Sequence, residues 1–142
     1  MIREFEYSDI DKIMSIWLEE NISAHKFISK EYWENHFEYV KSALPDAKIY
    51  VYTKNDEICG FIGMNSNYIE GIFVKSDKQH IGIGTALLNK VKQGNSQLTL
   101  NVYKKNVKAF RFYLKSGFEI IEEKDDTETG EKEYTMMWTN EL

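Results

Sequence analysis

The chain has 142 residues, of which 42% are hydrophobic and 29% charged, and this suits one globular domain with an adequate core. Its 18 basic and 23 acidic residues give a net charge of −5, which argues against a nucleic-acid-binding surface and slightly favours a cationic or amine partner. One cysteine excludes an intramolecular disulfide, the three histidines lack metal-ligand spacing, and no segment approaches the ~20 apolar residues of a membrane span. We therefore expect a single cytoplasmic domain over residues 1–142, with no metal and no membrane partner.

The first third of the chain predicts a short strand and two helices. Residues 1–7 alternate between apolar and polar side chains, as a strand does. Ser8 is the expected N-cap of an amphipathic helix that ends near Asn21. After a loop at 23–28, a second helix is expected to start at Ser29 and to be ended by Pro45. Its aromatic face either packs in the core or, with the loop of His25, lines a cleft.

Three strand-like runs follow, at residues 48–53, 58–64 and 68–74, and short turns at 55–56 and 65–67 join them into an antiparallel meander. The apolar neighbours of Cys59, which are Ile58, Phe61 and Ile62, suggest a buried small hydrophobic residue and not a nucleophile.

The last third predicts two further helices and three strands. A helix over 83–93 is stopped by Gly94, and a strand over 97–102 should lie parallel to the preceding strand because a helix separates them. A helix over 106–115, closed by Gly117, precedes two closing strands at 118–123 and 133–138. The fold class is α+β, a three-layer α/β arrangement of a mixed sheet with helices on both sides, in the order β-α-α-β-β-β-α-β-α-β-β.

A glycine-bearing turn, Gln79-x-x-Gly82-x-Gly84, joins the third meander strand to the helix at 83–93. The first N–H groups of a helix have no internal partner, and the helix dipole places partial positive charge there. A phosphate or pyrophosphate is the natural occupant, although a glycine-rich turn before a helix is often only a structural turn.

A second informative stretch lies in the helix at 106–115, where the spacing of Asn106, Ala109, Phe110 and Tyr113 places them on one helical face. Taken alone, this stretch allows Tyr113 to be an aromatic residue that simply packs on the sheet.

Together the two stretches resemble the GNAT superfamily of N-acetyltransferases, and the chain looks closest to its small bacterial single-domain members. Gln79-x-x-Gly82-x-Gly84 resembles the pyrophosphate loop of that family, and Asn106, Ala109 and Tyr113 followed by Gly117 resemble its second conserved block. The similarity in element order covers nearly the whole chain. It implies that the fourth and fifth strands splay apart, and that the cosubstrate is acetyl-CoA.

The resemblance also implies a set of coenzyme-binding residues. Backbone N–H groups of the glycine loop and the Thr85 hydroxyl would hold the pyrophosphate, unpaired backbone of the fourth strand would bond the pantetheine amides, and Asn106 would bond the pantetheine arm. The implied contacts are Ile72, Phe73, Val74, Gln79, His80, Ile81, Gly82, Ile83, Gly84, Thr85, Asn106 and Ala109.

For catalysis, the resemblance implies direct attack of an amine on the acetyl group. Tyr113 would protonate the departing thiolate, because a phenol with a pKa of about 10 is protonated at neutral pH. The amine must first lose a proton, and the candidate bases are Glu70 and His25. Glu70 should share a sheet face with Tyr68 and Ile72, but it could equally be a solvated strand residue. His25 could be an ordinary loop histidine.

Other functions are weaker or remain open. A nucleotide hydrolase loop requires a Lys directly after its last glycine, and no Lys follows Gly84. A dinucleotide-binding loop would have its third glycine at residue 87, which is leucine. The alternative of another class is a non-catalytic acyl-CoA sensor on the same fold. The sequence does not separate a lysine side chain, a protein N-terminus and a small amine as acceptor, nor a monomer from a homodimer.

Overall fold

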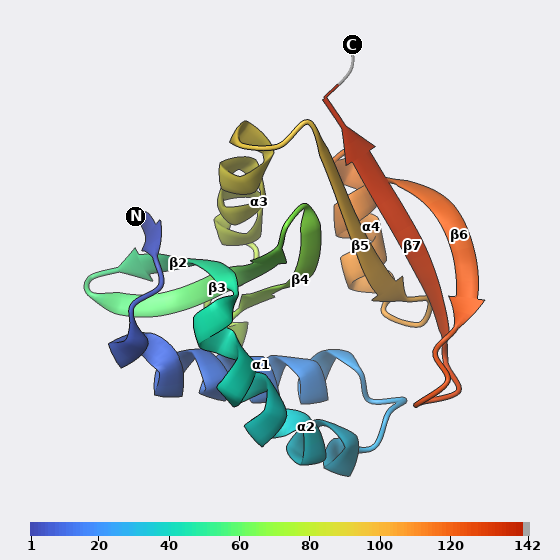
Figure 1. Ribbon diagram of the computed structural model, residues 1–142, viewed down its shortest axis with the longest axis horizontal. Coiled ribbons are helices and arrows are strands. Elements are labelled where there is room, and N and C mark those ends of the chain that lie inside the picture. The colour runs from blue at the N-terminus through green and yellow to red at the C-terminus, as the bar shows by residue number, and fades with distance from the viewer. Residues whose placement is uncertain (141–142) are drawn as a thin grey trace.

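The computed structural model describes residues 1–140, and the predicted order of elements is confirmed (Figure 1). The helices are α1 (Ile10–Ala24), α2 (Lys30–Ala43), α3 (Ile83–Gln93) and α4 (Val107–Lys115). The strands are β1 (Ile2–Glu4), β2 (Lys48–Lys54), β3 (Glu57–Asn65), β4 (Tyr68–Val74), β5 (Gln97–Tyr103), β6 (Glu119–Asp125) and β7 (Lys132–Thr139).

All seven strands form one sheet in the order β1-β2-β3-β4-β5-β7-β6. β4 and β5 are parallel, as predicted, and the other neighbouring pairs are antiparallel. The last strand, β7, lies between β5 and β6, so the chain turns back at the β6–β7 hairpin and inserts its end into the sheet.

The parallel pair is very short. Only Tyr68 with Thr99 and Ile69 with Leu100 are in register, after which β4 and β5 separate. Figure 1 shows β2–β4 turning away from the diagonal ribbons of β5, β7 and β6. The expected splay is therefore present, and it divides the sheet into two halves.

The helices cover both faces of the sheet. α1 and α2 pack on one face against apolar side chains of β2 and β3, such as Ile49, Val51 and Phe61. α3 and α4 pack on the other face, where the core runs without interruption from β3 to β7 and includes Cys59, Leu100 and Met136. Cys59 is fully buried, which confirms its predicted place in the core.

Several local predictions also hold. The Ser29 hydroxyl accepts a hydrogen bond from the backbone N–H of Tyr32 at the start of α2. Residues Asn55, Asp56 and Ser66 adopt positive φ in the two meander turns, as tight hairpin turns require.

The start of the first helix was predicted incorrectly. Ser8 does not cap α1, because a 3₁₀ turn over Tyr7–Asp9 precedes the helix. Asp9 is the N-cap residue of α1, but its carboxylate accepts the backbone N–H of Glu6 and pairs with Arg3, so it closes the preceding turn and makes no side-chain cap of the helix. α1 also continues three residues beyond Asn21, to Ala24.

Candidate active site

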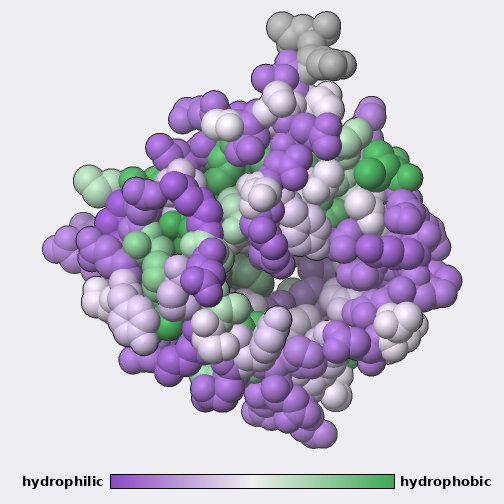
Figure 2. Space-filling view, viewed as in Figure 1, coloured by the Kyte–Doolittle hydropathy of each residue, from purple (hydrophilic) through white to green (hydrophobic). Residues whose placement is uncertain are grey.

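A cavity of about 940 Å³ opens where β4 and β5 separate, and residues of both sheet halves line it. The surface is hollowed near the centre of the molecule in this region (Figure 2). Of the fifteen residues predicted as site residues, this cavity is lined by all except Ile81. The side chain of Ile81 is 60% exposed and instead lines a smaller cavity beside the β2–β3 turn.

The glycine loop has the backbone geometry of an anion cradle. His80 and Gly82 have φ of 67° and 89°, and Gly82 is the N-cap residue of α3. The first intrahelical hydrogen bond runs from Ala86 N–H to the Gly82 carbonyl, so the preceding N–H groups at the start of α3 have no helical partner. A Cβ built on Gly82 would meet no atom within 4 Å, which leaves the approach to these donors open.

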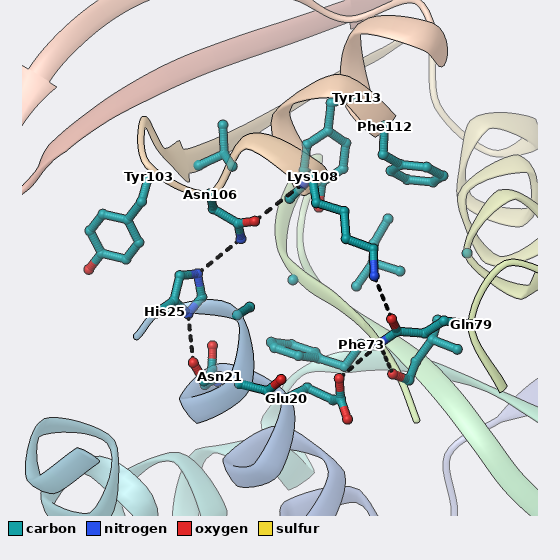
Figure 3. A pocket seen from close by; sticks show the side chains of 18 of the residues that line it. Glu20, Asn21, His25, Phe73, Gln79, Tyr103, Asn106, Lys108, Phe112 and Tyr113 are labelled. Atoms are coloured by element: carbon teal, nitrogen blue, oxygen red, sulfur yellow. Dashed lines mark hydrogen bonds between the residues drawn. The ribbon is translucent and has the colours of Figure 1, made fainter. Parts of the chain in front are cut away.

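Gln79 does not lie loosely beside this loop, because its side chain connects three elements (Figure 3). Its Nε2 donates to the Val74 carbonyl and to the Glu20 carboxylate, each at 2.9 Å. Lys108 Nζ donates to Gln79 Oε1 at 2.7 Å. Glu20 and Lys108 were not among the predicted site residues, and they bring α1 and α4 to the glycine loop.

A β-bulge displaces Glu70. Gly71 pairs with Gly63 and Ile69 with Met64, so Glu70 has no partner on β3. Ile69 and Ile72 both contact the core under α3, whereas Phe73 contacts the core under α1. The expectation that Glu70, Tyr68 and Ile72 share one sheet face is therefore wrong for Ile72, because the bulge reverses the alternation after Glu70.

Glu70 belongs to a polar wall that sequence reasoning missed. Tyr68, Asn101 and Glu133 also line the cavity, and Glu133 lies opposite Tyr103 in the β5–β7 register. Burial and the charges of Glu70 and Glu133 raise the pKa of the Tyr68 phenol to about 12. Burial, with the nearby charge of Asp126, also raises the pKa of the Glu133 carboxyl. The wall therefore gathers two carboxylates around one protonated phenol.

Tyr113 reaches the cavity from α4, on the opposite face of the sheet from this wall. Its side chain is 7% exposed and packs edge-on against Phe112 and Phe118. Its hydroxyl makes no hydrogen bond to the described residues 1–140, and burial followed by the nearby Tyr68 raises the pKa of this phenol. Tyr113 is thus both a packed aromatic residue and a protonated group at the cavity.

His25 and Asn106 come together, although 81 positions separate them in the sequence. His25 Nε2 lies 3.1 Å from Asn106 Nδ2, and Asn106 Oδ1 accepts the Ala109 N–H at the start of α4. The helix was expected to begin at Asn106, but Asn106 is instead its N-cap residue.

The second helix combines both predicted roles. Trp33 and Leu44 are buried, and Trp33 also lines the cavity. Tyr32 and His36 instead contact the β6–β7 loop, where the Tyr32 hydroxyl donates to Glu128 at 3.2 Å and His36 Nε2 lies 3.6 Å from the same carboxylate. α2 therefore contacts the β6–β7 loop through two side chains that share one carboxylate.

Within residues 1–140, no helix is both long and apolar enough to cross a membrane, and no three His, Cys, Asp or Glu side chains gather as metal ligands would.

Comparison with known proteins places these features in a family. The acetyltransferase (GNAT) domain family matches residues 14–139. The chain is 34% identical over 140 residues to peptidyl-lysine N-acetyltransferase YiaC of Escherichia coli, covering 97% of this chain and 96% of that protein. It is 31% identical over 120 residues to peptidyl-lysine N-acetyltransferase YjaB of Salmonella typhimurium, covering 84% and 83%.

Solved structures agree with the fold. The solution structure of apo-form YjaB from Escherichia coli superposes with a TM-score of 0.85 at 26% identity, over 97% of this chain and 96% of that chain. A Thermoplasma acidophilum PaiA N-acetyltransferase in complex with coenzyme A gives a TM-score of 0.83 at 22% identity, over 98% of both chains.

Proposed function

Since the chain belongs to the GNAT family of acetyltransferases, we propose that its acceptor is the side-chain amine of a lysine in a protein or peptide. The enzyme is an N-acetyltransferase that uses acetyl-CoA as cosubstrate and a primary amine as acceptor. Two relatives that are at least 31% identical are named peptidyl-lysine N-acetyltransferases, which supports this acceptor.

The observation that carries the proposal is the distribution of charge within the cavity. Glu70 and Glu133 line it beside Tyr68, whereas two lysines, Lys78 and Lys108, line it beside the glycine loop, where the single carboxylate of Glu20 already accepts a hydrogen bond from Gln79. A coenzyme carries its phosphates at one end and its thioester at the other, so its phosphates suit the lysine end. The carboxylates then suit an amine, which arrives protonated because the pKa of a lysine side chain is about 10.4.

For the coenzyme, the helical N–H groups at Ile83, Gly84 and Thr85 hold the pyrophosphate at the positive end of the α3 dipole. The backbone of Ile72–Val74 has no strand partner on the β5 side, because the register with β5 ends at Ile69. These free groups bond the pantetheine amides, and one of the N–H groups polarises the thioester carbonyl.

For the acceptor, Glu70 takes a proton from the ammonium group, and Glu133 holds the amine through its charge. The amine nitrogen then forms a bond to the acetyl carbon as the carbon–sulfur bond breaks, and the bonding electron pair leaves on sulfur. Tyr113 gives its phenol proton to that thiolate. The nitrogen, cationic after bond formation, loses its second proton to solvent as the amide forms, and the Tyr113 phenolate regains a proton from solvent. The carboxylates and Tyr113 approach the splay from opposite sheet faces, which suits an amine that enters on one side and a thiol that leaves on the other.

The test is a matched set of peptides with acetyl-CoA, in which free thiol is followed and the modified atom is located by mass spectrometry. One peptide has a blocked N-terminus and one lysine, the second has the lysine replaced by arginine and a free N-terminus, and the third has neither amine. Thiol release and acetylation with the first peptide only is the expected result.

Acetylation of the second peptide with the first left unmodified would refute the lysine assignment. Thermal stabilisation by acetyl-CoA, without thiol release from any peptide or small amine, would instead favour a non-catalytic coenzyme sensor.

A further inference from the structure

His25 is held from both sides of its ring by hydrogen-bond partners on different elements (Figure 3). Its Nδ1 lies 3.0 Å from the backbone carbonyl oxygen of Asn21 in α1, and its Nε2 lies 3.1 Å from Asn106 Nδ2 before α4. The contact crosses the cleft between the two sheet halves.

The orientation of the Asn106 amide decides which ring nitrogen of His25 carries the proton. Asn106 Oδ1 accepts the Ala109 N–H at 3.3 Å, so the amide nitrogen must be the group that faces His25. An amide nitrogen only donates, and therefore His25 Nε2 must accept. The ring proton then sits on Nδ1, where the Asn21 carbonyl receives it. His25 is thus a neutral imidazole with a single permitted tautomer.

Packing keeps the ring in this orientation. His25 stacks on Trp33 with centroids 5.1 Å apart and an interplanar angle of 28°, and it meets Tyr103 and Phe27 edge-on. Burial lowers the pKa of the imidazole, partly opposed by the Asn21 carbonyl. The titratable group on the neighbouring strand, Tyr103, is a phenol whose hydroxyl donates to Asp126. The surroundings therefore favour the uncharged ring.

We propose that His25 is a positioning residue for coenzyme binding and not the general base. An amide nitrogen carries two hydrogens, and His25 takes one of those on Asn106. The other is then fixed in direction and offered to a carbonyl of the pantetheine arm. This inference rests on the proposed coenzyme site, but it does not depend on which amine is the acceptor.

The same geometry argues against a base role. The lone pair of Nε2 is occupied by the Asn106 N–H, and the other ring nitrogen already carries the proton. A proton added at Nε2 would face a second donor and break the contact with Asn106. Protonation would therefore release the cap residue of the helix that carries Tyr113, instead of assisting the reaction.

Two substitutions separate the roles. His25→Gln keeps an amide donor and acceptor but cannot titrate, whereas His25→Phe keeps the aromatic ring and removes both nitrogens. The dissociation constant of coenzyme A is measured by calorimetry, and kcat is measured from pH 7 to 9.5. We expect His25→Phe to weaken coenzyme A binding about fivefold, the effect of one net hydrogen bond, and His25→Gln to restore most of this loss.

A double-substitution cycle gives an independent readout. With Asn106→Ala already present, His25→Phe should have no further effect on coenzyme A affinity, because the group that it orients is gone. Equal losses in both backgrounds would overturn the proposal.

A general base would behave differently. Both His25 variants would then bind coenzyme A normally, lose kcat at pH 7 and recover it towards pH 9.5, and this pattern would also overturn the proposal. If His25→Phe does not fold, as judged by circular dichroism, the His25→Gln affinity and pH profile decide alone. Normal coenzyme effects without acetylation of lysine peptides would refute the proposed acceptor and leave this inference standing.

Discussion

The sharpest prediction concerns Tyr113→Phe, which removes one oxygen atom and leaves the aromatic ring in place. The hydroxyl makes no hydrogen bond to residues 1–140, and the ring packs edge-on at 5.4 Å from Phe112 and 5.7 Å from Phe118. Removing a hydroxyl without a partner should change the free energy of unfolding by less than about 1 kcal/mol. The fold and the coenzyme site should therefore survive the substitution.

The effect on turnover follows from the acidity of the phenol. Burial raises the pKa of Tyr113 above its usual value of about 10, whereas a free thiol has a pKa of about 8.5. Proton transfer from this phenol to a thiolate is thus uphill. General acid catalysis typically contributes between about 10² and 10⁴ in rate, and we expect the lower end, about a 100-fold loss of kcat.

The assay follows free thiol at saturating acetyl-CoA, and calorimetry gives coenzyme A affinity for the same preparation. Tyr39→Phe is the matched control, since Tyr39 is 74% exposed on α2 and lines neither cavity. An unchanged kcat in Tyr113→Phe, or a collapse of coenzyme A affinity, would show that Tyr113 is not the proton donor.

Three further predictions concern the glycine loop, the two cavity carboxylates and the Asp9 carboxylate in the turn before the first helix. Gly82→Val should reduce acetyl-CoA affinity more than tenfold, because the left-handed φ of 89° strains any side chain there by about 1–2 kcal/mol and the new methyls crowd the phosphate site. Gly94→Val, at a negative φ with open space around it, is the control for calorimetry. Glu70→Gln should lower kcat about 100-fold at pH 7 and regain activity as the pH approaches the pKa of the amine, and a pH profile identical to that of the unmodified enzyme would count against the base role. Glu133→Gln should mainly raise KM for the amine, and an unchanged KM would count against its binding role. Asp9→Asn should cost about 2 kcal/mol in urea unfolding at pH 7. The hydrogen bonds from Arg3 lower the pKa of Asp9, so this stabilisation is present above about pH 4 and is lost as the pH falls through the pKa of Asp9 in the folded protein. A difference in unfolding free energy between Asp9→Asn and the unmodified protein that persists undiminished at pH 2 would contradict the role of the Asp9–Arg3 pair.

The parts of the fold that local chemistry specifies could be read from the sequence. Ser29 caps α2 with its own hydroxyl, and Gly117 closes α4 at a φ of 96° that other residues rarely adopt. The glycine loop and the Asn106 block were placed correctly because neighbouring residues alone determine them. Their meeting in one cavity was predictable only through the resemblance to a family.

Features that depend on long-range pairing could not be read in this way. The position of β7 between β5 and β6 depends on its register with β5, from Tyr103 opposite Glu133 to Gln97 opposite Thr139, and these partners lie far apart in the sequence. The bulge at Glu70 depends on how β3 pairs with β4, since simple alternation gives no sign of it. Glu133 looked like an ordinary polar residue of a hairpin strand, and only its place opposite Tyr103 brings it to the cavity.

The role of His25 also depends on contacts between residues that lie far apart in the sequence. His25 was a candidate base because it follows the first predicted helix in a loop where the resembled family usually builds its acceptor site. Its two hydrogen bonds come from α1 and from the N-cap of α4, which the sequence separates widely. Chemical type could therefore be read from the sequence, whereas the direction of the lone pair could not.

The short pairing of β4 with β5 has a consequence for the amount of enzyme in a cell. On the face under α3 and α4, a continuous core covers the region where the two sheet halves separate. The edge of β4 beyond Ile69, however, forms no backbone hydrogen-bond ladder with β5. Acetyl-CoA bound along that edge would supply hydrogen-bond partners in place of β5 and would stabilise only the folded chain. At a concentration 100 times its dissociation constant, such a ligand adds about 2.7 kcal/mol of stability. Resistance to proteolysis would then rise and fall with the supply of the enzyme's own acetyl donor.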